Sequence, residues 1–156
     1  MHSVNPDPAR RIVARIADEL AAVGWPIERV ELPEGEAAKR LAVIETAASE
    51  LARLRVERAE PLVAIGGGAL GDSAGFLAAT YLRGVPVIHV PTTLVAQIDS
   101  AIGGKTAVDL PEGKNLVGAF HQPSAIVIDI AVLRTLPERQ RRAALGEAVK
   151  MAALGD

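Results

Sequence analysis

The chain has 156 residues, which is enough for one domain with a sizeable core, and only 3% of them are aromatic, so that core must be aliphatic. Its net charge of -2 offers no basic surface for nucleic acid, and its lack of cysteine excludes disulfides, thiolate metal sites and a cysteine nucleophile. No apolar run approaches the ~20 residues of a membrane-spanning helix, and the N-terminus lacks the apolar centre of a signal peptide. We expect a cytoplasmic protein with no nucleic-acid or membrane partner.

The first part of the chain predicts two helices joined by an extended segment. The first helix begins with the capping acid and proline of Asp7-Pro8 and continues with apolar residues at helical spacing as far as Gly24. Alternating residues 29–32 predict a short strand, and residues 33–35 predict a turn. Apolar residues at helical spacing in 41–51 predict the second helix.

The remainder predicts strands that alternate with helices. Residues 62–65 are a short apolar run that ends in glycines, which is typical of a buried parallel strand, and residues 87–90 and 125–129 have the same character. A helix is predicted over 72–82, and a last helix begins at Pro137. This alternation predicts an α/β fold with a Rossmann-like parallel sheet and helices on both faces.

Between the last two predicted strands lies a long stretch, residues 91–123, that we predict to be irregular. A loop of this length inside a compact domain is usually functional. The charged residues in this one favour a functional role.

A glycine-rich turn follows the first predicted parallel strand. Residues 66–71 satisfy G-x-G-x-x-G between a strand and a helix, where backbone N–H groups can approach a pyrophosphate, although the same glycines also fit a tight turn. The acid expected at the end of the next strand is missing, because that place holds Thr92 and Thr93. Their hydroxyls can bind a ribose or phosphate, or cap a helix after Pro91. The unusual element is Asp72, directly after the glycines.

A second polar cluster lies in the long irregular stretch. Residues 99–106 and 113–115 place one carboxylate, two lysines and an amide among glycines. Such a cluster is expensive to leave unpaired inside a protein, and it makes sense if a phosphate lies among the lysines. The alternative is a solvated loop of charges.

Taken together, residues 66–72, 99–106, 113–115 and 146–150 resemble the 3-dehydroquinate synthase family, nicotinamide- and metal-dependent enzymes of the shikimate route to aromatic amino acids. The resemblance runs from about residue 32 to the end of the chain. It implies conversion of 3-deoxy-D-arabino-heptulosonate 7-phosphate to 3-dehydroquinate and phosphate, a carbon–oxygen lyase reaction.

The resemblance also implies an NAD site spread over six stretches of the chain. Without the resemblance, Glu36 and Lys39 would be an ordinary surface pair at i,i+3 spacing. The implied cofactor residues are Glu34, Gly35, Glu36, Lys39, Gly66, Gly67, Gly68, Ala69, Leu70, Gly71, Asp72, Thr92, Thr93, Lys105, Lys114, Val132, Leu133, Arg134 and Thr135.

The implied catalytic residues surround a sugar acid phosphate. By resemblance, Asp99 contacts the reacting ring, and the substrate and its phosphate are bound by Lys105, Lys114, Asn115 and Lys150. Arg83 matches an arginine that reaches the phosphate of the neighbouring subunit, which implies a homodimer when the protein is full length.

Glu147 matches the carboxylate ligand of a catalytic zinc or cobalt ion. On the residues alone, Glu147 and Lys150 would be a surface ion pair. By resemblance the other two ligands are histidines of a C-terminal helical domain, and His2, His89 and His121 do not replace them. One carboxylate cannot make a tight catalytic metal site.

We therefore interpret residues 1–156 as a single NAD-binding domain, truncated at both ends, that lacks the helical domain and is inactive alone. One alternative is another sugar phosphate cyclase of the inosose or valiolone type, although residues 118–123 favour the dehydroquinate branch. A second is a non-catalytic nucleotide-binding or oligomerisation module. A third, a metal-dependent polyol dehydrogenase, is disfavoured by Lys105 and Lys114.

Overall fold

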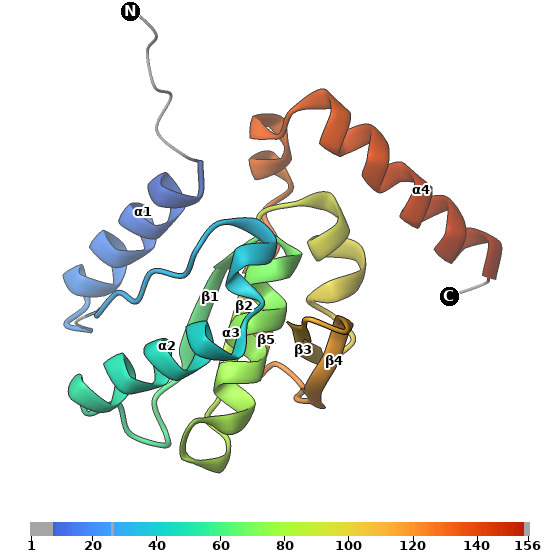
Figure 1. The fold of residues 1–156 in the computed structure, drawn as a ribbon. Coiled ribbons are helices and arrows are strands. Elements are labelled where there is room, and N and C mark those ends of the chain that lie inside the picture. Colours follow the sequence, from blue (N-terminus) through green and yellow to red (C-terminus); the bar gives the residue numbers. More distant parts are fainter. Residues whose placement is uncertain (1–7, 26, 155–156) are drawn as a thin grey trace, which may run out of the picture.

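The protein has an α/β fold built on a three-stranded parallel sheet (Figure 1). The computed structural model describes residues 8–25 and 27–154. The sheet has the order β1-β2-β5, formed by β1 (Leu62–Gly66), β2 (Val87–Pro91) and β5 (Ala125–Ile126). Leu62 pairs with Val87 and Ile88 with Ala125, and both pairings are parallel. The predicted α/β class and parallel sheet are confirmed.

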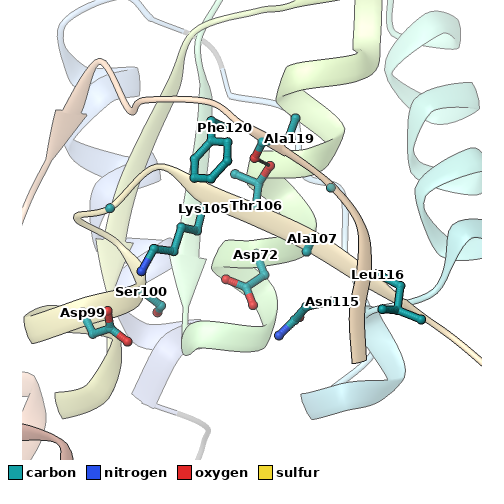
Figure 2. Close-up of a pocket in the computed structure, with 12 residues that line it drawn as sticks. Asp72, Asp99, Ser100, Lys105, Thr106, Ala107, Asn115, Leu116, Ala119 and Phe120 are labelled. Carbon is teal, nitrogen blue, oxygen red and sulfur yellow. Dashed lines mark hydrogen bonds between the residues drawn. The ribbon is translucent and has the colours of Figure 1, made fainter. Parts of the chain in front are cut away.

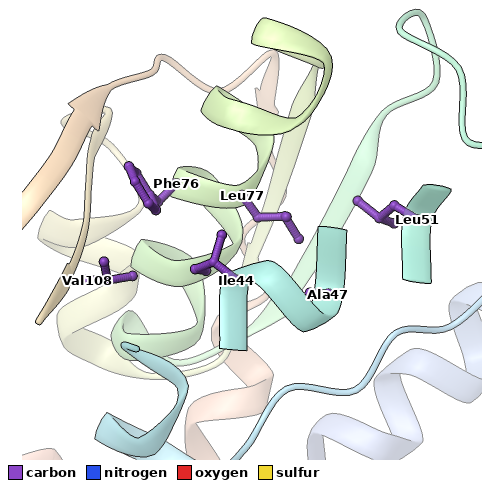
Figure 3. Packing of buried hydrophobic residues seen from close by; sticks show 6 residues of the cluster. All are labelled: Ile44, Ala47, Leu51, Phe76, Leu77 and Val108. Carbon is purple, nitrogen blue, oxygen red and sulfur yellow. The ribbon is translucent and has the colours of Figure 1, made fainter. Parts of the chain in front are cut away.

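Helix α3 (Gly68–Thr80) lies at the centre of the molecule. Most of its residues are small or apolar, and none before Thr80 is exposed, as expected for a helix that is covered on most sides. Ala74 and Ala78 pack with Ala64 of the sheet in one buried cluster. Phe76 and Leu77 lie in a second buried cluster, with residues of α2 (Leu41–Arg53) and β3 (Lys105–Leu110) (Figure 3).

The region 91–123 is not irregular, so that prediction was wrong. It holds the π-helical turn η3 (Ala96–Ser100) and an antiparallel hairpin of β3 (Lys105–Leu110) and β4 (Gly113–Phe120). The buried side chains of Thr106 and Val108 face α3. A Cβ atom at Gly75 would lie 2.5 Å from the Thr106 Cγ2 atom, so glycine at this position lets α3 approach the hairpin closely.

The N-terminal region differs from prediction in one element. Helix α1 (Pro8–Ala22) forms as expected, although its predicted cap Asp7 lies outside the described residues. Residues 29–32 form no strand among the described residues; Val30 and Leu32 instead pack, partly buried, against the core cluster of α2, α3 and β3. The predicted turn at 33–35 leads into the 3-10 turn η1 (Gly35–Ala38), and α2 extends two residues beyond its predicted end.

Several boundaries shift elsewhere. Helix α3 begins four residues before the predicted start and gives way at its end to the 3-10 turn η2 (Tyr81–Arg83). The last strand is two residues long and is followed by η4 (Ile130–Thr135). Helix α4 (Glu138–Leu154) follows Pro137 as predicted.

The two faces of the sheet are covered unequally. Helix α3 covers one face, and α1 contacts β1 (Figure 1). Val63 alternates with the buried Ala64 and so points to the opposite face, where it is 41% exposed. The second face is therefore covered only in part. Among the described residues, no helix combines the length and apolarity needed to cross a bilayer.

Candidate functional site

The glycine turn joins β1 to the N-terminus of α3. Gly67 is the N-cap residue, and no side chain caps the helix. A Cβ atom at Gly67 would lie 3.1 Å from the Thr93 Cγ2 atom, and one at Gly68 would lie 3.0 Å from the Ser100 Oγ atom. The backbone therefore lies close to two neighbouring segments, and the uncapped helix N-terminus offers N–H groups and a positive dipole end to an anion.

The two threonines lie beside this turn, at the carboxyl end of β2. The backbone N–H of Thr92 donates to the Gly66 carbonyl at 2.8 Å, which joins the ends of the two strands. The Thr93 hydroxyl accepts from the Ala96 N–H at 3.4 Å, so the capping interpretation holds for this residue in the structure. The carboxyl edge of a parallel sheet is where ligands bind in open α/β folds.

Three polar side chains from distant segments meet next to this turn. Lys39, which is only 4% exposed, donates from Nζ to Asp72 Oδ2 at 2.6 Å. The same ammonium donates to the Asn115 Oδ1 atom. Lys39 follows η1, Asp72 belongs to α3 and Asn115 to β4. The interpretation of Lys39 as a surface partner of Glu36 is therefore wrong.

Burial and the pairing with Lys39 shift the pKa of Asp72 in opposite directions. Removal from water raises the pKa of the Asp72 carboxyl above its ordinary value of 3.8, and the hydrogen bond and charge of Lys39 lower it. Burial prevails, so the net pKa is raised. The environment of Asp72 therefore disfavours its charged form on balance.

A cavity of about 510 Å³ opens beside these residues (Figure 2). Asp72 and Asn115 lie on one side of it, and Lys105 lies with Asp99 and Ser100 on the other (Figure 2). Its complete lining is Asp72, Asp99, Ser100, Gly103, Lys105, Thr106, Ala107, Asn115, Leu116, Gly118, Ala119 and Phe120.

Asp99 and Ser100 are held in place through η3. The buried side chain of Gln97 donates from Nε2 to the carbonyls of Pro91 and Asp129, each at 3.1 Å. These bonds tie the π-helical turn to β2 and to the segment after β5. Short π-helical turns are frequent at functional sites.

Lys105 and Lys114 do not lie together. They occupy opposite ends of the hairpin, because Lys105 pairs with Phe120 and the neighbour of Lys114, Gly113, pairs with Leu110. Lys114 forms an exposed ion pair with Glu36 at 2.8 Å, and its pKa is raised by that hydrogen bond. The Lys105 ammonium makes no hydrogen bond or ion pair with any described residue. Among the described residues that line the cavity, Lys105 is the one unpaired cation.

Glu147 and Lys150 form an ion pair on α4. The pKa of Lys150 is raised by Glu147 and, to a smaller extent, by the charge of Asp99, so this part of α4 lies near η3. Within residues 8–25 and 27–154, no group of three His, Cys, Asp or Glu side chains could hold a metal ion. Glu147 alone does not fit a catalytic zinc or cobalt ion, which needs three protein ligands.

The two described histidines, His89 and His121, make contacts inside the fold. His89 is buried beneath Gly71 of α3, and its pKa is lowered by burial and then by the charge of His121. His121 contacts the Val85 carbonyl through Nε2 at 2.9 Å. His2 lies outside the described residues.

Three other predicted segments do not line the cavity. Arg83 is exposed in η2, beyond the end of α3 that lies away from Asp72; the helix rises about 12 Å from Asp72 to Thr80 at 1.5 Å per residue. Its backbone φ is 65°, in the left-handed region. Residues 132–135 belong to η4, and none of them lines the cavity. Glu34 precedes the η1 turn, where Gly35 also has a left-handed φ of 64°.

Sequence reasoning missed the cavity residues contributed by the hairpin. Thr106, Phe120 and the neighbouring Asp109 belong to strands that were predicted as loop. The signal was present: Thr106 and Val108 alternate as a strand would, and Pro111-Glu112-Gly113 is typical of a turn.

The family relationship is visible along most of the chain. The sequence model of the family described as "3-dehydroquinate synthase N-terminal" matches residues 29–143. The 3-dehydroquinate synthase of Symbiobacterium thermophilum is 51% identical over 152 residues, which is 97% of this chain and 42% of the relative. That of Geobacter metallireducens is 53% identical over 86% of this chain and 38% of the relative. The chain thus spans about two fifths of the length of these curated relatives.

Solved structures agree with this relationship. A 2-deoxy-scyllo-inosose synthase complexed with carbaglucose-6-phosphate, NAD+ and Co2+ has a TM-score of 0.85 and 36% identity, over 95% of this chain and 40% of the other. The 2-epi-5-epi-valiolone synthase of Streptomyces hygroscopicus, with NAD+ and Zn2+ bound, has a TM-score of 0.83 and 33% identity, over 89% of this chain and 39% of the other. A glycerol dehydrogenase of Schizosaccharomyces pombe, 22% identical with a TM-score of 0.65, shares the fold.

Proposed function

The chain belongs to the 3-dehydroquinate synthase family, and from that premise we propose that it is the NAD-binding part of a 3-dehydroquinate synthase. One observation carries the proposal: an uncapped helix N-terminus at a glycine turn, with the buried Lys39–Asp72 pair and a cavity beside it. Relatives about half identical to the chain carry this enzyme name. NAD is named in the structures of two similar synthases.

The residues present fit a dinucleotide. The N–H groups of the turn 66–71 would bind its diphosphate, because they lie at the positive end of α3 and have no side-chain cap. Asp72, Lys39 and Asn115 supply both acceptors and donors, which suits ribose hydroxyls and a carboxamide. The chemistry that the cofactor supplies when bound is reversible removal of a hydride from a ring alcohol.

The other proposed cofactor residues lie around this centre. Glu34 to Lys39 would approach the adenosine half, and Thr92 and Thr93 would line the turn. Residues 132–135 and the two hairpin lysines complete the set that the family resemblance implies. Lys114 would reach a ligand only after leaving Glu36, its partner in the structure.

The anionic substrate would bind on the Lys105 side of the cavity. Lys105 is an unpaired cation there, and a phosphate or carboxylate would supply the charge-assisted hydrogen bonds that it lacks among the described residues. Asp99, on the same side of the cavity as Lys105, is proposed to contact the reacting ring. Lys150 is electrostatically coupled to Asp99 and is proposed as a further substrate lysine. Arg83 is proposed to serve the site of a second subunit, since it lies far from this one.

The metal-dependent steps are not assigned to this chain. The described residues offer Glu147 and no further ligands around it, so the metal site of the family does not fit within them. Turnover, the choice of metal and homodimerisation therefore belong to a protein of the full length of the relatives. A homodimer and a cytoplasmic location are parts of the same proposal and rest on the resemblance alone.

Two alternatives differ from this proposal in testable ways. An inosose or valiolone synthase is supported by the similar solved structures, but their identities of 36% and 33% are lower than those of the named dehydroquinate relatives. Supplying the sugar acid phosphate of the dehydroquinate reaction and neutral sugar phosphates without a carboxylate separately to a full-length protein would distinguish them. A non-catalytic module would bind nucleotide and leave every sugar phosphate unchanged.

The NAD site can be tested on this chain directly. Calorimetric titration with NAD should give heat for the wild type, and Gly68→Val should abolish it by blocking the approach of the diphosphate to the turn. Gly146→Val is the matched control, because a Cβ at Gly146 meets nothing within 4 Å. Equal binding by wild type and Gly68→Val would overturn the assignment of the turn. Absence of heat from the wild type would overturn NAD binding by this chain.

A further inference from the structure

A buried aspartate that does not line the cavity connects two of the residues that meet at Asp72. Asp109, at the end of β3, is 9% exposed. Its Oδ1 atom accepts the backbone N–H of Asn115 at 2.8 Å, and its own N–H donates to the Lys39 carbonyl at 2.9 Å. Lys39 and Asn115 are 76 residues apart in the chain, and Asp109 bonds to both.

In the hairpin, Asp109 lies outside the regular pairing of β3 with β4. The pairing of β3 with β4 shifts register between Val108 and Leu110, so Asp109 has no partner on β4. It pairs with Arg40 instead, as an isolated parallel bridge. Irregularities of this kind redirect a side chain and occur beside active sites. Here the irregularity lets Asp109 reach both the η1–α2 connection and the hairpin turn.

The backbone conformation of Asn115 needs a stabilising hydrogen bond. Its backbone φ is 57°, in the left-handed region, which is uncommon for residues other than glycine. The hydrogen bond from its N–H to the Asp109 carboxylate fixes the backbone in this conformation, and its side chain then accepts from Lys39. If this hydrogen bond were lost, the Asn115 side-chain amide and the Lys39 ammonium would no longer be held together at Asp72.

We infer that Asp109 is a positioning residue: it holds Lys39 and Asn115 in the arrangement in which, with Asp72, they receive the dinucleotide. The identity of the ligand rests on the proposed function; the arrangement itself rests on the contacts above. The carboxylate acts here as a hydrogen-bond acceptor, so asparagine, whose Oδ1 is also an acceptor, should replace it.

The test compares Asp109→Ala, Asp109→Asn and, as a control of equal charge, Glu112→Ala in the exposed turn of the same hairpin. NAD affinity measured by calorimetry should fall about tenfold or more in Asp109→Ala, and stay within about threefold of wild type in the other two. Hydrogen exchange of the Asn115 amide, measured by NMR without NAD, should be slow in wild type and Asp109→Asn and about tenfold or more faster in Asp109→Ala.

The two readouts separate this inference from the proposed function. No NAD heat from the wild type would overturn the function, while Asn115 exchange would still decide the role of Asp109. An unprotected Asn115 amide in the wild type would overturn the inference, whether or not Asp109→Ala folds. So would NAD affinity in Asp109→Asn as weak as in Asp109→Ala, because the acceptor would then not be what matters.

Discussion

Replacing Lys39 by methionine should destabilise the fold far more than the same replacement of Lys114. Both lysines pair with a carboxylate, but Lys39 is 4% exposed whereas the Lys114 side chain is 72% exposed. Lys39→Met keeps most of the side-chain volume and removes two charge-assisted hydrogen bonds, each worth about 1.5–3 kcal/mol. Because the Asp72 side chain is 20% exposed, water replaces part of the lost hydrogen bonding. We therefore expect the free energy of unfolding to fall by about 2–3 kcal/mol.

Urea unfolding followed by circular dichroism measures this difference. In a chain of this size the loss corresponds to a drop in melting temperature of about 5–10 °C. Lys114→Met should unfold at the wild-type urea concentration, since solvent screens its pair with Glu36. Equal midpoints for the two variants would refute the reasoning that burial gives the Lys39 pair its importance.

The stability lost in Lys39→Met should depend on pH. Lys39 lowers the pKa of Asp72 against the effect of burial, so Lys39→Met should raise that pKa further above its ordinary value of 3.8. An NMR titration of the Asp72 carboxyl carbon measures the shift. Protonated Asp72 needs no counter-charge, so the stability deficit of Lys39→Met should be largest near neutral pH and should shrink as the pH falls through the raised pKa. A deficit independent of pH would show that the cost comes from packing.

Three further predictions follow from the fold and the site. Gly75→Ala should lower stability by about 1–3 kcal/mol in thermal unfolding, since its Cβ would lie 2.5 Å from the Thr106 Cγ2 atom, whereas Gly146→Ala, with open space around it, should not. The folded-state pKa of His89 is lowered below 6.5, so the stabilising contribution of its neutral form is present above that pH and lost as the pH falls through the lowered pKa. His89→Gln should accordingly reduce the loss of stability between about pH 7.5 and about pH 5, measured by urea unfolding. With NAD, zinc and the seven-carbon substrate, the chain alone should release phosphate no faster than a blank, because its described residues hold no three-ligand metal site.

The elements that the sequence predicted well are those with one dominant signal. The apolar runs 62–65 and 87–90 are strands that pair in parallel, and the glycine turn between a strand and a helix lies where the pattern indicates. The hairpin 105–120 was missed because its polar residues were interpreted as loop chemistry, although Thr106 and Val108 alternate on its buried face. Residues 29–32 alternate in a similar way, but Val30 and Leu32 pack against the core cluster without forming a strand, and sequence spacing cannot show that.

The candidate site was predicted residue by residue but not as an arrangement. Local spacing paired Glu36 with Lys39, whereas the structure pairs Lys39 with Asp72, 33 residues away, and Glu36 with Lys114. Long-range pairs of this kind depend on how α3 and the hairpin pack, which no i,i+3 rule contains. Asp109 was not predicted for the same reason, because its contacts with Lys39 and Asn115 form only when the hairpin has formed.

The most direct test of the account is an NMR titration of this chain with NAD, followed residue by residue. The account predicts that the largest amide shifts occur in the glycine turn 66–72, at Lys39 and at Asn115, with none in α1. Shifts confined to other parts of the chain, or saturation with no change in the glycine turn, would contradict the claim that this edge of the sheet is a dinucleotide site.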